Sequence, residues 1–424
     1  MTTLTSHDPY LALRYRDFRL LLTGNFIASL GSQMLVLAVG WELYERTDSA
    51  LALGIVGLVQ ILPILLLAFV TGHVADQYDR KSVVVLSQVT LVFTALGLAA
   101  ISFWHGSLIA VYGCLLFRGI GSAFNGPAAN ALPAELVPEQ AFENSASWRS
   151  SVGQLAAVVG PALGGTLIAI LGGTAFVYVL TALAGSTFVV LLLFVRSGRR
   201  PGRAANGKRE PVTLRSLGEG IGVLRRTPVI LSAITLDLFA VLFGGVTTLL
   251  PIFARDILGV GPAGLGWLQA APSVGAFGVA IFLAHRPPLR QAGPTFLIAV
   301  AGFGLATIFF GFSRSFELSL AMLLVLGGLD SVSMVIRDTL MLTRIPDEMR
   351  GRVAAIEGVF VSSSNQLGGF ESGLTAQFFG PVLSVVGGGI GTILVVAIVA
   401  AVSPRLRRLT TLREPVLSGS RPDA

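Results

Sequence analysis

The dominant feature of this sequence is a series of long apolar stretches separated by short polar segments. Each is long enough to cross a bilayer core of about 30 Å as a helix, which takes roughly 20 residues. A stretch such as 150–195, with no charged residue, does not show the alternation of a membrane β-strand. We therefore predict an all-α membrane protein with twelve transmembrane helices, at 18–44, 51–73, 82–103, 107–130, 146–170, 174–195, 229–254, 263–284, 293–313, 315–338, 352–378 and 380–403.

Composition and charge agree with this prediction. Only 12% of the residues are charged, whereas a soluble domain carries roughly a quarter. The net charge of +7 has a topological explanation, because most of the 30 basic residues fall in cytoplasmic segments or at the cytoplasmic ends of spans when the N-terminus is placed inside. Cytoplasmic loops of membrane proteins carry such an excess of Lys and Arg. Both termini are therefore expected in the cytoplasm, and no nucleic-acid partner is needed to explain the charge.

A basic segment at 196–226 interrupts the pattern between the sixth and seventh helices. It carries nine basic residues together with Gly, Pro and Asn, as a solvated linker does. We expect an N-terminal six-helix bundle at 1–195, a cytoplasmic linker at 196–228, a C-terminal six-helix bundle at 229–403 and a cytoplasmic tail at 404–424.

The two halves resemble each other at an offset of about 208 residues. "GLVQILP" at 57–63 matches "GWLQAAP" at 266–272, "LVPEQ" matches "RIPDE", and Gly160 and Gly165 fall on Gly368 and Gly373. Fixed offsets of this kind indicate internal duplication. An even number of helices in each half gives both copies the same orientation in the membrane, which is the parallel-repeat arrangement of one class of transporters.

The segment "GHVADQYDRK" is expected in the cytoplasmic loop between the second and third helices. Its residues Gly72, Asp76, Arg80 and Lys81 resemble the loop signature of the major facilitator superfamily. The resemblance implies a conformational latch, in which the glycine permits a close approach of the second and eleventh helices. The aspartate then pairs with basic residues and a helix N-terminus, where a negative charge is favoured. This chain departs from the signature at Gln77 and at Asp79, where glycine is common.

Two further resemblances concern the direction of transport and the branch of the superfamily. "GPALGG" in the fifth helix, with Gly160, Pro161, Gly164 and Gly165, is similar to the glycine-proline motif of antiporter-type members of that superfamily and implies export. The segments "ALPAELVPEQAFENSAS" and "RIPDEMRGRVAAIEG" resemble the branch that contains the enterobactin exporter and the macrolide efflux proteins. That branch indicates the inner (plasma) membrane of a bacterial-type cell.

Polar residues inside the predicted spans are the candidates for the transport site, because a charge at the centre of a helix needs a partner or a water-filled cavity. The resemblance implies that helices 1, 4, 7 and 10 line the central cavity. The candidates for proton coupling are Asp237, Arg118, Asp330 and Glu371, and those for the substrate cavity are Asn25, Ser29, Gln33, Ser122, Asn125, Phe239 and Phe243. Their helical spacing places neighbours on shared faces.

Two hypotheses remain open for Asp237. A carboxyl group removed from water can load and release a proton, and Asp237 is then the coupling group. Alternatively, a buried pair between Asp237 and Arg118 only orders the bundle. The glutamine common three residues after the helix 4 arginine of the superfamily is replaced here by Gly121, which weakens a proton-relay role for Arg118.

The function expected from these features is export of a bulky amphipathic small molecule, such as a drug, a macrolide-like compound or a siderophore, by proton antiport and alternating access. The alternatives are a proton-coupled importer or a lysophospholipid flippase of the same fold, or a membrane scaffold or receptor without transport. No nucleotide-binding loop, histidine cluster or catalytic triad is apparent. We expect a monomer in the bilayer that is not an enzyme, uses the proton gradient, and needs no metal or other cofactor.

Overall fold

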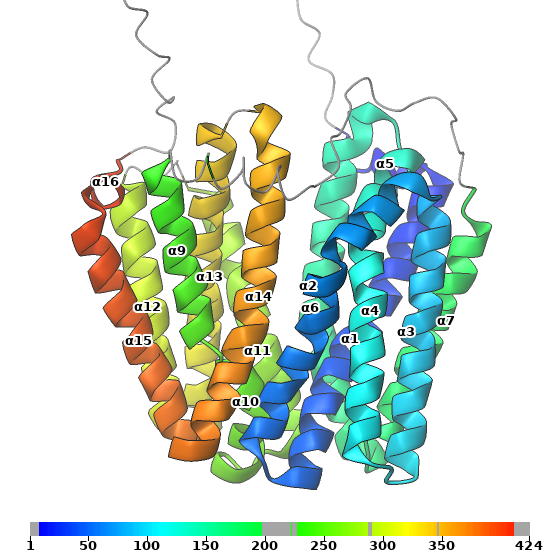
Figure 1. Cartoon of the computed structure of the whole chain (residues 1–424), viewed down its shortest axis with the longest axis horizontal. Helices are drawn as coiled ribbons and strands as arrows, with labels where there is room; N and C mark the ends of the chain where they lie inside the picture. Colours follow the sequence, from blue (N-terminus) through cyan, green and yellow to red (C-terminus); the bar gives the residue numbers. More distant parts are fainter. Residues whose placement is uncertain (1–7, 197–221, 223–226, 287–290, 346, 411–424) are drawn as a thin grey trace, which may run out of the picture. The chain divides into compact units, whose positions relative to one another are not determined.

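The computed structural model describes residues 8–196, 222, 227–286, 291–345 and 347–410, and these residues are helical with no β-strand (Figure 1). The chain divides into two compact units. The first contains Met1–Glu42 and Val59–Pro211, and the second contains Leu43–Leu58 and Val212–Ala424. Most of the predicted linker and the tail after residue 410 lie outside the described residues.

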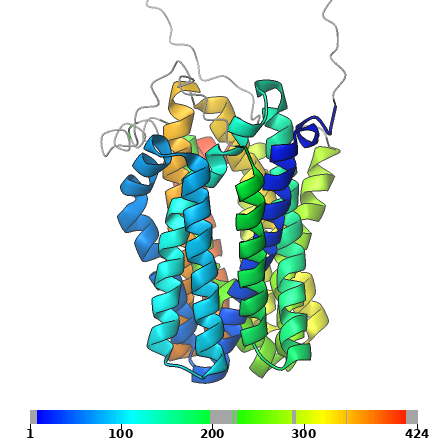
Figure 2. The ribbon, with the colours of Figure 1, turned by 90° about the vertical axis from the view of Figure 1, so that its right-hand side faces the viewer.

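The first unit contains most of the N-terminal helices. These are α1 (Arg16–Thr47), α2 (Ala50–Gln77), α3 (Arg80–Phe103), α4 (Leu108–Ala131), α5 (Pro133–Leu136), α6 (Phe142–Leu171) and α7 (Ala175–Phe194), with 3-10 turns at Ala12–Arg14 and Glu139–Ala141. The last turn of α1 and the start of α2 belong to the second unit. Helix α3 packs against both α4 and α7, and Figure 2 shows α3 and α4 side by side in cyan.

The second unit contains the C-terminal helices. These are α9 (Pro228–Phe243), α10 (Val246–Ile252), a π-helical turn (Phe253–Ile257), α11 (Gly261–Ala284), α12 (Ala292–Phe312), α13 (Phe316–Arg344), α14 (Asp347–Phe379), α15 (Pro381–Val402) and α16 (Pro404–Arg407). Helix α13 packs on α11 and α12, and α15 packs on α12 and α9. An apolar core around Phe296 and Ile336 joins α9, α12, α13 and α15.

Eleven helices of the described chain are long and apolar enough to cross a membrane. The eleventh predicted helix, α14, has 33 residues but is not one of them. It carries the polar run Ser362-Ser363-Ser364-Asn365-Gln366, which lowers its mean hydropathy. Twelve helices in two halves remain consistent with this result, because α14 has the length of its neighbours and packs against α9 and α15.

The segment expected as a loop after the second helix is mostly helical. Helix α2 continues to Gln77 and α3 begins at Arg80, so only Tyr78 and Asp79 connect them. Charged residues mark the end of the apolar span, but helices commonly extend beyond that span into the polar region. For the same reason α13 continues to Arg344 and α14 begins at Asp347.

The predicted seventh helix is broken into three pieces, unlike its repeat partner α1. Helix α9 ends at Phe243, and Gly244 and Gly245 separate it from α10. The carbonyl oxygen of Gly368 lies close to the position that a Cβ of Gly245 would take, so a side chain there would strike the backbone of α14. Val36 and Leu37 occupy the equivalent positions of the continuous α1.

Equivalent glycine contacts recur in the two units at an offset of 208 residues. Gly119 of α4 packs against Pro63 of α2, and Gly327 of α13 packs against the backbone of Pro272 of α11. Likewise Gly160 of α6 packs on α1 at Gln33, and Gly368 of α14 packs on α9 at the backbone oxygen of Val241. Small residues allow helices to approach backbone to backbone. The internal repeat is therefore a repeat of helix packing as well as of sequence.

Candidate functional site

The predicted latch residues Arg80 and Lys81 bind the ends of other helices in the first unit. Arg80 forms an ion pair of 3.0 Å with Glu135 of α5, and its Nη1 donates to the carbonyl oxygen of Ala131 at 3.5 Å. Lys81 Nζ donates to the carbonyl oxygen of Val195 at 2.6 Å. Cations are favoured at helix C-termini. Asp76 lies in α2 with its side chain outside the described residues, and the predicted contact of Gly72 stays a prediction.

The departure from the signature at Asp79 has a structural role. Its carboxylate accepts hydrogen bonds from the backbone N–H of Ser82 at 2.9 Å and from the Ser82 hydroxyl at 2.7 Å. Asp79 is thus the N-cap of α3.

Replacing this cap is expected to weaken α3. Asp79→Ala should lower the free energy of unfolding by about 1 kcal/mol, because it leaves the first backbone donors of α3 without an acceptor. Asp79→Asn should be nearly neutral, and Asp79→Gly should cost only a few tenths of a kcal/mol. Thermal unfolding of the detergent-solubilised variants measures their order of stability. Equal stability of the Ala and Asn variants would contradict the capping role.

A cavity of about 170 Å³ lies inside the first unit, among α1, α3, α4 and α7. Five predicted site residues line it: Asn25 and Ser29 on α1, and Arg118, Ser122 and Asn125 on α4. The polar faces inferred from helical spacing therefore meet within this unit. The sequence prediction missed three other polar residues of its wall, although each was visible as a polar residue in an apolar span: Ser32, Gln88 and Thr181.

Three predicted cavity residues lie elsewhere. Gln33 faces the tight contact between α1 and Gly160 of α6. Phe239 and Phe243 on α9 stack on each other, with ring centroids 6.2 Å apart. None of the three lines this cavity, and none lines the small cavity of the second unit that is described below. Their contact with substrate stays a prediction.

The glycine-proline motif of α6 supports the wall of the first cavity from behind. Gly160, Pro161, Gly164 and Gly165 are all buried. Gly160 packs at Gln33 and Gly164 packs at Met34, so both approach α1 at the turn that follows the cavity residue Ser32. A larger side chain at either glycine would push α1 away. The motif therefore packs closely on α1, and its link to export stays a prediction.

A cluster of buried charges lies in the second unit. Asp237 on α9 forms an ion pair with Arg337 on α13, and each is 6% exposed. Arg337 Nε also lies 2.7 Å from Oε1 of Glu357 on α14. The hydroxyl of Ser333 donates to Asp237 at 3.5 Å. One arginine thus joins carboxylates from two other helices.

Asp237 and Arg118 lie in different units, and each has a partner within its own unit. The cation at Asp237 is Arg337, and Arg118 instead donates from Nη2 to the hydroxyl of Ser32 at 2.6 Å. Arg337 lies one turn after Ser333 on α13, so both face α9. Neither Arg337 nor Glu357 is among the predicted site residues, although each carries the signal that selects Glu371, a charge within an apolar span.

The second unit has its own small cavity beside this cluster. Asp237, Asp330 and Ser333 line it, and its space of about 10 Å³ is close to that of one water molecule. These three residues stand 208 positions after Ser29, Ser122 and Asn125 of the first cavity. The repeat has therefore produced equivalent cavities with different chemistry, with an arginine in one and carboxylates in the other.

Glu371 lies apart from both cavities. It is half-buried on α14 and accepts a hydrogen bond from the neighbouring Ser372 hydroxyl at 3.4 Å. The structure therefore separates it from the cluster that contains Asp237 and Asp330.

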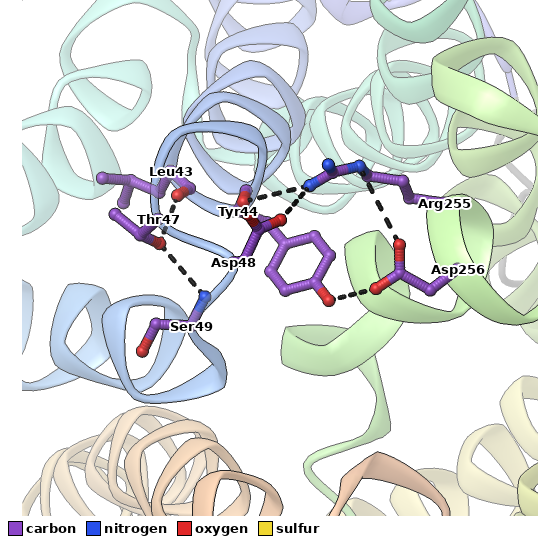
Figure 3. A network of polar contacts seen from close by, with 7 residues as sticks. All are labelled: Leu43, Tyr44, Thr47, Asp48, Ser49, Arg255 and Asp256. Carbon is purple, nitrogen blue, oxygen red and sulfur yellow. Dashed lines mark hydrogen bonds and ion pairs between the residues drawn. The ribbon is translucent and has the colours of Figure 1, made fainter.

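A second polar cluster joins the turn between α1 and α2 to the π-helical turn (Figure 3). Arg255 Nη1 donates to Asp48 at 2.6 Å and to the carbonyl oxygen of Tyr44 at 3.4 Å. The hydroxyl of Tyr44 donates to Asp256, and the Arg255 guanidinium lies 5.4 Å from the centre of the Tyr44 ring. This cluster and the bond from Ser49 to Gln377 fix Leu43–Leu58 to the second unit.

The geometry described so far, two helical units with repeated packing and a polar cavity in each, can be compared with known proteins. The family model described as "Major Facilitator Superfamily" matches residues 21–370. The chain belongs to the Major Facilitator Superfamily. This match covers both repeats, and the family resemblance inferred from the loop signature is confirmed.

Curated relatives within this superfamily align over nearly the whole chain. The multidrug efflux pump Tap of Mycolicibacterium fortuitum is 25% identical over 406 residues, which cover 93% of this chain and 98% of Tap. The enterobactin exporter EntS of Escherichia coli O1:K1 is 26% identical over 392 residues, with 92% of each chain covered. Both bear out the predicted branch of drug and siderophore exporters.

Solved structures of the superfamily show the same fold. A bacterial homologue of the human lysosomal transporter Spinster, in an inward-facing and unoccupied conformation, aligns with a TM-score of 0.70 at 17% identity, and the alignment covers 97% of this chain and 98% of that chain. The nucleoside transporter NupG aligns with a TM-score of 0.71 at 13% identity, over 91% of this chain and 98% of NupG. The protein is a multi-pass membrane transporter of the Major Facilitator Superfamily.

Proposed function

We propose that this transporter exports bulky amphipathic small molecules by proton antiport and alternating access, from the inner membrane of a bacterial-type cell. Support for export comes from Tap and EntS, a multidrug efflux pump and an enterobactin exporter whose alignments cover 93% and 92% of this chain. The single observation that carries the proton coupling is the cluster of Asp237, Asp330 and Glu357 around the buried Arg337.

The charge balance of this cluster favours a role in proton transfer. Three carboxyl groups gather near one guanidinium, and an uncompensated charge within a membrane protein is costly. Protons are the cations that can balance the excess negative charge in a cavity of about 10 Å³. Asp237 and Glu357 both contact Arg337, whereas Asp330 has no ion pair among the described side chains. We therefore assign the exchanged proton to Asp330 and the fixed ion pairs to Arg337.

Transport measurements in inside-out vesicles test this function. The substrate is first chosen as the compound to which an efflux-deficient bacterial strain gains resistance when it expresses the full chain. Proton antiport predicts that this compound accumulates in vesicles with an acidic lumen and that dissipation of the pH gradient stops the accumulation. Loss from the vesicles under the same gradient would favour the importer, and movement of a fluorescent lysophospholipid alone would favour the flippase.

Substitution of Asp330 separates coupling from binding. Asp330→Asn is expected to abolish accumulation driven by the pH gradient and to preserve exchange of labelled for unlabelled substrate, because the amide cannot release a proton. Glu317→Gln is the matched control, since Glu317 is an exposed carboxylate on the same helix. Gradient-driven accumulation that survives in Asp330→Asn would exclude Asp330 as the coupling group.

A further inference from the structure

Arg118 is a buried cation with no anionic partner among the described residues of its own unit. It is 8% exposed, and it donates a single hydrogen bond from Nη2 to the hydroxyl of Ser32. No carboxylate in the described part of the first unit forms an ion pair with it. The other buried arginine, Arg337, contacts two carboxylates. A guanidinium has five N–H donors, so most of the hydrogen-bonding capacity of Arg118 is unused.

The wall around Arg118 suits an anion. None of the described residues that line the first cavity is acidic. Hydroxyl or amide groups that can donate hydrogen bonds come from Asn25, Ser29, Gln88, Ser122 and Asn125, whereas the Thr181 hydroxyl already donates to backbone carbonyls. A buried charge is strongly unfavourable unless it is paired. The cavity therefore supplies donors and one positive charge, and it lacks the negative charge that would balance them.

The size of the cavity limits what it can hold. Its volume of about 170 Å³ is smaller than the roughly 300–1,000 Å³ of pockets that enclose a drug-sized molecule. It has room for a compact charged group at one end of a larger molecule. The planar fork of arginine matches the two oxygens of a carboxylate or phosphate.

The geometry points to an oxyanion-binding subsite in the first cavity, in which Arg118 pairs with a carboxylate or phosphate group of the transported molecule. This inference rests on the proposed function only for the statement that the bound molecule is transported. It narrows the substrates to amphipathic molecules that carry an anionic group. It also gives the two equivalent cavities different tasks, with the substrate anion bound in one and the proton in the other.

Binding of small probes to the full chain in non-ionic detergent tests the subsite. Benzoate and its neutral analogue benzamide are titrated by ligand-observed NMR, with inorganic phosphate as a competitor. Benzoate is expected to bind and benzamide is not. Displacement by phosphate would show that the subsite takes free oxyanions, whereas benzoate binding without displacement would show that it needs an anion attached to an apolar body. Equal binding of benzoate and benzamide would overturn the inference.

Variants connect this binding to Arg118. Arg118→Gln should weaken benzoate binding about tenfold or more, the loss expected for a charge-assisted hydrogen bond. Arg149→Gln is the matched control, because Arg149 lies in the same unit, contacts Asn130 and does not line the cavity. Undiminished benzoate binding by a folded Arg118→Gln variant would exclude Arg118 as the anion partner.

A second variant keeps Arg118 and avoids dependence on the folding of Arg118→Gln. In Ser32→Asp the new carboxylate lies where Arg118 now donates its hydrogen bond, so it should take the place of the ligand anion. We expect loss of benzoate binding with equal or greater thermal stability. Retained benzoate binding would contradict the subsite. If the protein binds benzoate but moves no selected compound in the vesicle assay, the proposed function is contradicted and the subsite is not.

Discussion

Arg337→Gln is expected to destabilise the second unit by about 3–5 kcal/mol, the range observed when one partner of a buried ion pair is removed. The substitution leaves Asp237 and Glu357 buried without their shared cation. The hydroxyl of Ser333, 3.5 Å from Asp237, is too weak a donor to replace it. Unfolding by sodium dodecyl sulfate, followed by tryptophan fluorescence of the detergent-solubilised protein, measures the loss.

Two controls separate the ion cluster from a general effect of losing an arginine. Arg314→Gln removes an exposed arginine from the loop between α12 and α13 and should change stability by less than about 0.5 kcal/mol. Combining Arg337→Gln with Asp237→Asn and Glu357→Gln removes all three charges and should recover most of the stability, because the buried charges are then absent. A charge-free variant as unstable as Arg337→Gln would show that side-chain packing, and not charge, dominates at this position.

Gly275→Ala is expected to cost about 3 kcal/mol, at the upper end of the range for overpacking in a close-packed interior. The position of a Cβ at Gly275 coincides with the backbone carbonyl of Leu324 on α13. Because Gly327 meets the backbone of Pro272 in the same way, α11 and α13 are in backbone contact at two points. A rigid backbone cannot rotate aside as a side chain can, so the helices would have to separate. Lower yield of folded protein and a lower unfolding temperature are the expected results.

Gly278→Ala is the matched control on the same helix. Apart from its chain neighbours and the backbone of its own helix, no described atom lies within 4 Å of the position of its Cβ. Alanine also has the higher helix propensity, by about 1 kcal/mol in water, so the variant should be as stable as the original protein or slightly more stable. If Gly275→Ala and Gly278→Ala unfold at the same temperature, the backbone contact between α11 and α13 has no energetic importance.

The fold was largely predictable because its physical cause is local in the sequence. A run of apolar residues of bilayer length can satisfy its backbone hydrogen bonds in lipid only as a helix, and the predicted spans at 82–103 and 263–284 agree with α3 and α11 to within two residues. The predicted helices differ from the observed ones where contacts with other helices change the local backbone. The glycines at 244 and 245 break the seventh helix because α14 and Phe303 lie against them, and nothing in the hydropathy of this segment indicates such neighbours.

The candidate site was predictable in part. Helical spacing groups Asn25 with Ser29, and both line the first cavity, because residues one turn apart share a face. Helical spacing does not predict which residue forms an ion pair with each buried charge. Asp237 has candidate cations on α4 and α13, and only the packing of α9 on α13 selects Arg337.

The membrane class of the protein, its helices, its internal repeat and its superfamily follow from the amino-acid sequence, because each of these depends on the order and chemistry of neighbouring residues. The packing of the helices sets which charges are paired. It placed Arg337 between two carboxylates and left Arg118 facing a polar cavity without one. Electrostatic pairing depends on distances of a few ångströms between residues far apart in the chain, and only the packing of the helices sets those distances.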